Sequence, residues 1–368
     1  RVIPFDPSKN NQNEETDYES EEKQVNTNQD INFFMNVSDE EGHEIVSKIG
    51  EGNSSIAYKV IDHQHKRVLC KKVLKEKEYE TVFPEFQKKM KEIEVLNQDH
   101  HPSICEVIGV NIEGRHESES DNESEDKKEK EKGSFEEEDN DDDDDDKKEV
   151  KEGKKHKIAS FYFEYLPYNV SKCLSENILN NTMKTKIAIE VAFGMSFIHS
   201  KKQIHRNLNI SNIRLNNVYE SKIINFSQVR VSTFGISNRT LTKSIGEIAY
   251  MSPEMAREED YNEKTDVYSY GVILHVLFSG KPPKQSMNEK LSKKEAILAE
   301  PSKWISSKCI DLIKKCISNE IQQRPSFDEI IDEIYSNNFE LASEIDISSV
   351  LQRYLSLNRF RSQHQNKS

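Results

Sequence analysis

The chain has 368 residues and a formal net charge of −14, but this charge is not spread evenly along it. Residues 113–156 hold 21 acidic and 10 basic residues, and residues 1–42 hold 11 acidic and 3 basic ones, which leaves the remainder at +5. A uniformly acidic protein is therefore excluded. No apolar run approaches the roughly 20 residues of a membrane helix, and no signal-peptide pattern opens the chain. Because it begins with Arg1 rather than Met, we read it as a fragment or a processed chain.

Cysteine usage predicts a reducing environment. The chain has five cysteines, an odd number, and their wide spacing forms neither a C-x-x-C pair nor a disulfide framework. We therefore expect an intracellular, cytoplasmic location. The five are Cys70, Cys105, Cys173, Cys309 and Cys316.

Two polar segments are expected to be disordered, because they offer little apolar surface to bury. The first is 1–42, in which Ile31–Met35 is apolar and available to dock on a folded body. The second is 113–156, which contains six consecutive aspartates, Asp141–Asp146. The strand pattern stops before this second segment and resumes after it, so we interpret it as an insertion within a domain. Such an insertion is tolerated because loop-closure entropy grows only logarithmically with length.

The first folded block, residues 43–163, is predicted to be mostly β with one helix. Phe86, Met90, Ile93 and Leu96 recur at helical spacing and predict a helix over 86–96. The expected strands are 44–49, 56–61, 68–74, 104–112 and 158–163.

The second folded block, residues 170–336, is predicted to be mainly helical. Ile187, Val191, Met195 and Ile198 share one face of a helix. The nearly apolar stretch Val267–Phe278 predicts a buried helix. Residues 337–368 are expected to form a helical tail or a linker.

A glycine-bearing turn between the first two strands is the first candidate binding motif. Gly50, Gly52 and Ser55 form a G-x-G-x-x-S pattern, followed by Ala57. Glycines let a backbone approach phosphates closely and present N–H groups to them. The strand–turn–strand setting excludes a Rossmann dinucleotide site. Taken alone, the motif is as well explained by a bare hairpin turn.

The third strand carries two adjacent lysines that could neutralise phosphates. Side chains alternate along a strand, so Lys72 shares a face with Cys70 and Lys71 shares the other face with Leu69. A cysteine beside an adenine pocket is easier to accommodate than a leucine, which favours Lys72. The pattern alone leaves both registers open.

Later motifs resemble those of eukaryotic protein kinases, in the same order. His205–Asn212 reads H-R-N-L-N-I-S-N and resembles the catalytic loop H-R-D-L-x-x-x-N. Ile223–Ser227 lies where D-F-G belongs, and Tyr250–Glu254 resembles the A-P-E end of the activation segment. The amino-acid sequences of the segments Asp266–Val272 and Arg324–Phe327 are similar to those of the tyrosine-kinase-like serine/threonine group.

The resemblance covers residues 43–336 and implies an α+β, bilobal protein-kinase-like fold. It implies a small β-rich N-lobe over 43–166, carrying the insertion, and a larger helical C-lobe over 167–336. The residues that match ATP-contacting positions of the family are Gly50, Gly52, Ser55, Ala57, Cys70, Lys72, Glu92, Glu164 and Leu166. Those that match its structural positions are Leu96, Val107, His205, Phe226, Glu254, Asp266 and Arg324, with Glu254 and Arg324 expected to form a buried ion pair.

Four asparagines stand at the positions that carry kinase chemistry. Asn207 occupies the general-base position, and its amide cannot take up a proton at neutral pH. Asn225 occupies the main metal-ligand position, where an amide is a weaker ligand for Mg²⁺ than a carboxylate. Asn209 replaces a lysine near the γ-phosphate, whereas Asn212 keeps the second metal-ligand position. A retained scaffold with degraded chemistry is typical of a pseudokinase.

Three hypotheses about function follow. The leading one is a catalytically impaired kinase domain that binds ATP weakly, with Mg²⁺ binding in question, and acts as a scaffold or allosteric partner of signalling proteins, an active kinase among them. The first alternative is a slow serine/threonine kinase that transfers the ATP γ-phosphate to protein. The second makes the acidic insertion a binding module for basic proteins, carried on a kinase fold. No nucleic-acid partner and no membrane segment are expected.

Overall fold

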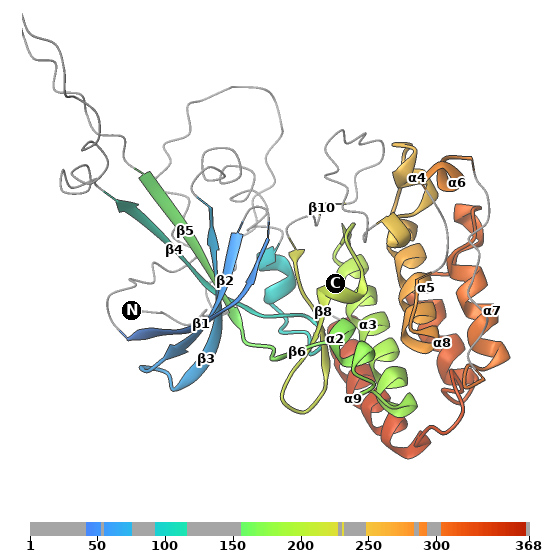
Figure 1. Cartoon of the computed structure of the whole chain (residues 1–368). Coiled ribbons are helices and arrows are strands. Elements are labelled where there is room, and N and C mark those ends of the chain that lie inside the picture. Colours follow the sequence, from blue (N-terminus) through green and yellow to red (C-terminus); the bar gives the residue numbers. More distant parts are fainter. Residues whose placement is uncertain are drawn as a thin grey trace, which may run out of the picture.

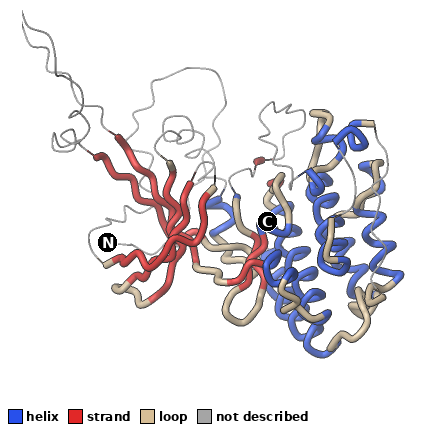
Figure 2. The backbone as a smooth tube through the Cα atoms, in the orientation of Figure 1, coloured by secondary structure: helices blue, strands red, loops and turns tan. Residues whose placement is uncertain are grey.

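The computed structural model describes residues 42–52, 55–75, 93–115, 156–226, 230–231, 248–282, 287–292 and 303–365. Strands gather at one end of the molecule and helices at the other, as Figure 2 shows. The smaller end is an antiparallel sheet and the larger end is mainly helical. This arrangement confirms the predicted α+β, bilobal kinase-like fold.

Five antiparallel strands form the sheet of the N-lobe, in the order β1-β2-β3-β5-β4 (Figure 1). The fourth strand begins at Val107, later than the predicted start at Ile104. The reason is that Ile104 forms a parallel bridge with Ile223 of the other lobe instead of joining the sheet. The strands are β1 (His43–Glu51), β2 (Ser55–Asp62), β3 (Arg67–Leu74), β4 (Val107–Arg115) and β5 (His156–Glu164).

The acidic insertion lies between two paired strands. Residues 113–115 and His156, which the sequence placed in the insertion, belong instead to these strands, because Arg115 at the end of β4 pairs with His156 at the start of β5. Residues 116–155 themselves lie outside the described part of the chain, as do residues 1–41. The helix predicted over 86–96 is described only from Ile93 onward, and residues 93–97 are helical.

The strand register gives the sheet two chemically different faces. Lys72 lies opposite Ala57 on β2 and Phe161 on β5, and these define what we call the inner face, together with Cys70 and Val107. Phe161 and Val107 belong to the main hydrophobic core. Lys71 lies opposite Tyr58 and Tyr162, and these three residues with Leu69 define the outer face.

The C-lobe is built around the buried helix that the sequence predicted. This helix, α5, ends at Gly280, which adopts the left-handed conformation with a φ of 77°. A side chain at Gly271 would place its Cβ 2.6 Å from that of Cys316, so a glycine is required where α5 meets α7. The helices are α2 (Val170–Ser175), α3 (Asn181–Ser200), α4 (Pro253–Ala256), α5 (Lys264–Ser279), α6 (Met287–Leu291), α7 (Ser307–Cys316), α8 (Phe327–Ser336) and α9 (Ile347–Gln365).

Short strands and 3₁₀ turns complete the C-lobe next to the sheet. The three-stranded sheet β6-β8-β9 and the pair β10-β7 lie among the helices. The strands are β6 (Tyr168–Asn169), β7 (Gln203–Ile204), β8 (Ile213–Leu215), β9 (Ser221–Ile223) and β10 (Arg230–Val231). The turns are η1 (Ile210–Asn212), η3 (Ile248–Tyr250) and η4 (Ile321–Gln323).

The predicted C-terminal tail is helical, and it packs on the C-lobe rather than extending as a linker. Helix α9 lies against α3, and its residues Val350, Tyr354 and Leu357 are part of the main core. The ring of Tyr354 meets that of Phe193 on α3 edge to face, with the ring centres 5.6 Å apart. Residues 347–365 therefore belong to the folded lobe.

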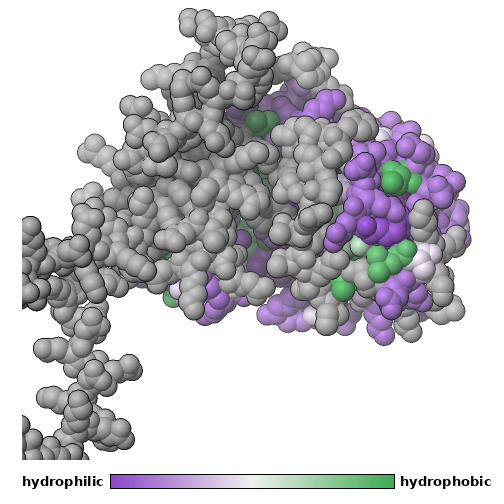
Figure 3. Space-filling view, turned by 90° about the horizontal axis from the view of Figure 1, so that it is seen from above, coloured by the Kyte–Doolittle hydropathy of each residue, from purple (hydrophilic) through white to green (hydrophobic). Residues whose placement is uncertain are grey.

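The surface of the described residues is largely polar. On the face seen in Figure 3, the helical lobe is mostly hydrophilic, with small hydrophobic patches separated from one another. Within the described ranges, every helix is too short or too polar to cross a bilayer.

Candidate functional site

Asp266, at the first turn of α5, organises the loop that precedes η1. Its carboxylate accepts hydrogen bonds from the backbone N–H groups of His205 and Arg206, both at 2.8 Å, and from His199 Nε2 at 2.9 Å. Burial alone would raise the pKa of Asp266, but the hydrogen bond and charge of His199 hold it below its ordinary value. The buried carboxylate thus fixes the backbone of the predicted catalytic loop.

Four of the residues matched to structural positions of the family lie buried in the interior. Leu96, Val107, His205 and Phe226 are all buried, and the hydrophobic ones share a single cluster. The rings of His205 and Phe226 meet edge to face at 5.7 Å between their centres. The Asn97 amide is bonded to both backbone groups of Val107, at 2.9 and 3.0 Å. The structure therefore joins positions that are far apart in the sequence.

The four asparagines at the candidate catalytic positions form one cluster of amides. Asn209 Nδ2 donates to Asn207 Oδ1 at 2.9 Å, and Asn212 Nδ2 donates to the Asn207 carbonyl at 2.7 Å. Asn225 Nδ2 donates to Asn212 Oδ1 at 3.3 Å. Asn209 Oδ1 also caps η1 by accepting from the backbone N–H groups of Ser211 and Asn212. The cluster holds its geometry without any formal charge on its four side chains.

This donor set does not fit the magnesium site of a protein kinase. Mg²⁺ is a hard cation that proteins hold through carboxylates and substrate phosphates. The cluster offers only amide and backbone oxygens, and Asn212 Oδ1 already accepts from Asn225. Among the residues that the structure describes, no three His, Cys, Asp or Glu side chains gather into a metal-binding group.

The strand register separates the two candidate lysines. Lys72 projects from the inner face, and burial lowers the pKa of its amine. Lys71 projects from the outer face, where its Nζ lies 5.7 Å from the centre of the Tyr162 ring. Of the two lysines, only Lys72 shares a face with the side chains that join the main core.

The inner face of β3 looks toward the C-lobe. Burial raises the pKa of the Cys70 thiol, and the positive charges of Arg214 on β8 and of Lys72 partly oppose that shift. Arg214 comes two residues after Asn212, which ends η1 and belongs to the asparagine cluster.

The glycine turn is described at its two ends. Gly50 pairs with Ala57, and the backbone N–H of Gly52 donates to the Ser55 carbonyl at 2.8 Å. Glu92, which the sequence matched to an ATP-contacting position of the family, lies outside the described residues.

Glu164, at the end of β5, has a side-chain role that sequence reasoning did not identify. Its carboxylate accepts from Lys222 Nζ on β9 at 2.6 Å and from the Glu106 backbone N–H at 2.8 Å. These bonds tie the end of the N-lobe sheet to β9 beside the buried Leu166. The sequence matched Glu164 and Leu166 only to ATP-contacting positions of the family.

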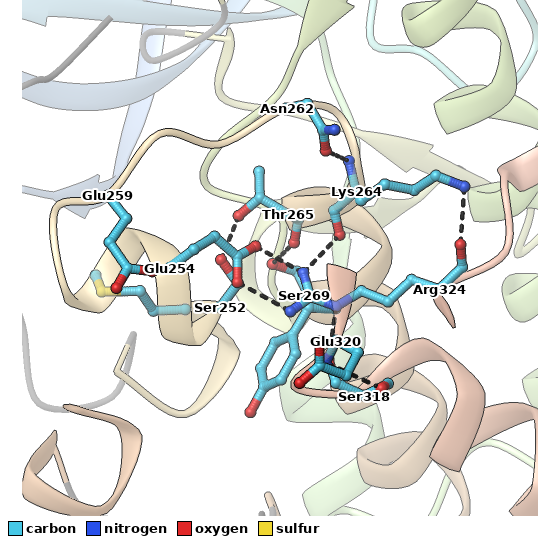
Figure 4. A network of polar contacts seen from close by, with 12 residues as sticks. Ser252, Glu254, Glu259, Asn262, Lys264, Thr265, Ser269, Ser318, Glu320 and Arg324 are labelled. Atoms are coloured by element: carbon cyan, nitrogen blue, oxygen red, sulfur yellow. Dashed lines mark hydrogen bonds and ion pairs between the residues drawn. The ribbon is translucent and has the colours of Figure 1, made fainter. Parts of the chain in front are cut away.

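Glu254 and Arg324, which were expected to pair, form a bidentate ion pair inside the C-lobe. Arg324 Nη1 lies 2.6 Å from Glu254 Oε1 and Nη2 lies 2.9 Å from Oε2, and both side chains are almost completely buried. Burial alone would raise the pKa of Glu254, but the hydrogen bonds and charge of Arg324 hold it below its ordinary value. Arg324 also donates to the Lys264 and Ser318 carbonyls, so the pair joins α4, α5 and the turn before α8 (Figure 4).

A second buried carboxylate lies behind β9 and was missed from the sequence. Glu190 on α3 accepts from the backbone N–H and the hydroxyl of Ser221, at 2.7 and 2.6 Å, and from Arg353 Nε of α9 at 2.6 Å. Burial raises the pKa of Glu190. The available signal was a glutamate inside the otherwise apolar run Ile187–Phe193, which requires a buried partner.

A buried lysine beneath the end of the activation segment was also missed. Lys290 on α6 is completely buried, and its Nζ donates to the carbonyls of Ala249, at 3.1 Å, and of Met251. The same amine lies over the Tyr268 ring, 4.7 Å from its centre. Burial lowers the pKa of Lys290 to about 7. Its polar sequence neighbours gave no signal of this position.

Comparison with known proteins agrees with this geometry. The protein kinase domain family matches residues 43–336. A probable serine/threonine-protein kinase of Dictyostelium discoideum is 33% identical over 160 residues, which is 41% of this chain and 11% of that protein. The dual specificity protein kinase pyk3 of the same organism is 30% identical over 164 residues, or 42% and 12% of the two chains. A serine/threonine-protein kinase of Arabidopsis thaliana is 29% identical over 164 residues, or 44% and 27%. The match thus spans well under half of each relative's length.

Proposed function

The chain belongs to the protein kinase family, and from that premise we propose that it is a catalytically impaired member that binds ATP weakly and acts as a signalling scaffold or allosteric partner. The family in general uses ATP and Mg²⁺. The observation that carries the proposal is the cluster of four neutral asparagines at the positions where the family places its base, its lysine and its metal ligands.

The absence of carboxylate charges at Asn207 and Asn225 slows the chemical step, phosphoryl transfer. A positioned general base contributes typically 10²- to 10⁴-fold in rate, and Asn207 cannot accept the proton. Phosphoryl transfer also depends on metal ions that neutralise charge between the β- and γ-phosphates. With an amide at Asn225, that stabilisation is weakened, and each ~1.4 kcal/mol of it is worth a further tenfold in rate.

The nucleotide-binding side of the proposal rests on the N-lobe. Lys72 on the inner face and the Gly50–Ser55 turn would contact phosphates, and the backbone after Glu164 would contact adenine. Because phosphate affinity in this family relies largely on the metal, we expect ATP to bind weakly and with little dependence on Mg²⁺. All five thiols are free, which supports a reducing intracellular compartment. The amino-acid sequence of the Asp266–Val272 segment supports membership of the tyrosine-kinase-like group.

A phosphotransfer assay tests the impairment. We would incubate the protein with radiolabelled ATP and a panel of generic protein substrates, next to the Lys72→Ala variant. The proposal predicts that any incorporated label is the same for the two proteins. Turnover that disappears in Lys72→Ala would instead establish the alternative, a slow serine/threonine kinase.

The acidic insertion is a second candidate for partner binding. It leaves the sheet at Arg115 and returns at His156, so its removal would make these two residues a two-residue turn and keep the register from the Gly114–Lys157 pair onward. A variant lacking residues 116–155 should retain the melting temperature of the intact chain. If the insertion recruits basic proteins, only the intact chain would capture fluorescent polylysine at physiological salt. Equal capture by both proteins would exclude this role.

A further inference from the structure

Three of the four residues that define the outer face of the five-stranded sheet are buried, although the main hydrophobic core lies on the inner face. Tyr162 is 1% exposed, Leu69 is 2% exposed and Lys71 is 6% exposed. Leu69 and Tyr162 pack with Ile108 in a small cluster of their own, separate from the main core. The burial of this face is therefore not produced by the packing of the two lobes.

An antiparallel sheet that faces water on one side keeps the side chains of that side accessible. Burial of a tyrosine to 1% needs a covering segment. His43, at the start of β1, is part of that cover, because its ring stacks on Tyr162 with the centres 5.2 Å apart. The described chain therefore begins, at Gly42 and His43, beside the outer face.

We propose that the apolar run Ile31–Met35 docks on this outer face and covers Leu69 and Tyr162. Met35 precedes His43 by eight residues, which reach about 26 Å when extended at ~3.3 Å per residue. The ring of His43 is already in contact with Tyr162, so the run can reach the outer face. In an extended conformation, Ile31, Phe33 and Met35 point to the same side and match a sheet face.

Docking of this run has a consequence for β3. The strand carries Lys71 on its outer face and Lys72 on its inner face, so a segment packed on one side restrains the strand that positions the other lysine. The N-terminal tail would thus be an integral brace of the N-lobe. This inference does not depend on whether the domain is catalytically impaired.

Hydroxyl-radical footprinting of the full chain tests the docking. The test variant carries Ile31→Ser, Phe33→Ser and Met35→Ser, and the matched control carries Val2→Ser, Ile3→Ser and Phe5→Ser in the other apolar stretch of the tail. Oxidation of each labelled peptide is read by mass spectrometry. Tyr268, which is 1% exposed in the C-lobe, reports whether each variant remains folded.

We expect oxidation of Tyr162 and Leu69 to rise several-fold in the test variant and to stay at the wild-type level in the control, with Tyr268 protected throughout. Unchanged protection of Tyr162 in the test variant would overturn the proposal. Exposure of Tyr162 in the control variant would assign the face to residues 2–5 and overturn it as well. Protection that falls on dilution of the wild type would point to a second copy of the chain, which also contradicts docking in cis.

Discussion

An asparagine side chain has nearly the shape of an aspartate but carries no charge, and this difference separates structure from chemistry in the candidate site. At the two positions where the family has aspartate, Asn207 Oδ1 accepts from Asn209 Nδ2 at 2.9 Å, and Asn225 Nδ2 donates to Asn212 Oδ1 at 3.3 Å. The loop therefore keeps its conformation through hydrogen bonds that an amide can make. What it lacks is a proton acceptor and a charged ligand, the two properties that depend on ionisation.

The buried ion pair between Glu254 and Arg324 is predicted to stabilise the folded protein. Replacing Arg324 with alanine leaves a buried carboxylate without its partner, so the free energy of unfolding should fall by about 3–5 kcal/mol. Urea unfolding followed by circular dichroism measures the change. Lys315→Ala, which removes the solvent-exposed pair with Glu333, is the control and should change stability by less than about 1 kcal/mol. Equal effects of the two substitutions would contradict a structural role for the buried pair.

Lys290 gives a prediction about pH. Burial lowers the pKa of its amine from 10.5 to about 7. The nearby negative charge of Glu254 raises this pKa by a smaller amount, and the positive charge of Arg324 lowers it. Between these two values the folded chain binds fewer protons on Lys290 than the unfolded chain does, so stability that depends on this residue rises with pH. The free energy of unfolding of the wild type, relative to Lys290→Met, should increase from pH 7 to pH 9 by up to ~1.4 kcal/mol per pH unit.

The measurement is urea unfolding of both proteins at the two pH values. Lys308→Met, at an exposed ion pair with Glu340, serves as the control and should show no such trend relative to the wild type. A relative stability that stays constant or falls as the pH rises would show that Lys290 keeps its proton in the folded protein.

Three elements that are distant in sequence meet at the buried carboxylate of Glu190. Helix α3 supplies the carboxylate, β9 supplies two donors from Ser221 and α9 supplies Arg353. Strand β9 leads directly to Ile224 and Asn225. The C-terminal helix therefore supports the strand that positions the candidate metal-ligand residue.

Arg353→Met should destabilise the protein by about 3 kcal/mol or more, because it leaves Glu190 buried without a cation. Because burial already raises the pKa of Glu190, the loss should shrink as the pH is lowered toward 5 and the carboxyl takes up a proton. Thermal or urea unfolding at pH 5 and pH 7 tests this. Arg359→Met, on the exposed side of the same helix, should be nearly neutral; an Arg353→Met effect that is equally small would mean that α9 does not brace β9.

The five strands of the N-lobe sheet, the helices α3 and α5 and their order could be predicted from the sequence, because hydrophobic periodicity and motif order are local signals. Three features could not be. The choice between Lys71 and Lys72 depends on strand pairing, which only the assembled sheet defines. The docking of α9 depends on contacts with α3 across more than 150 residues of sequence, as at Arg353. The burial of Lys290 depends on carbonyls of a different segment, and no pattern around position 290 indicates them.

At the scale of the whole molecule, the two lobes are joined by backbone and side-chain bonds next to the candidate site. The backbone of Cys105 donates to the Ile223 carbonyl at 2.9 Å, and that of Ile223 donates to the Ser103 carbonyl at 2.8 Å. The ion pair of Lys222 with Glu164 lies beside them. These contacts preserve the lobe arrangement of a kinase independently of catalysis, as a scaffold or allosteric partner requires.

The most direct test of the account is a thermal-shift titration of the wild type with ATP, with and without Mg²⁺, next to Asn225→Asp. A ligand that binds only the folded state raises the melting temperature by an amount that grows with the logarithm of the ratio of its concentration to its Kd. The account predicts a small ATP-induced shift in the wild type that does not change when Mg²⁺ is added, and a larger, Mg²⁺-dependent shift in Asn225→Asp. A wild-type shift that grows markedly with Mg²⁺ would contradict it, because the asparagine cluster would then hold the metal that an active kinase needs.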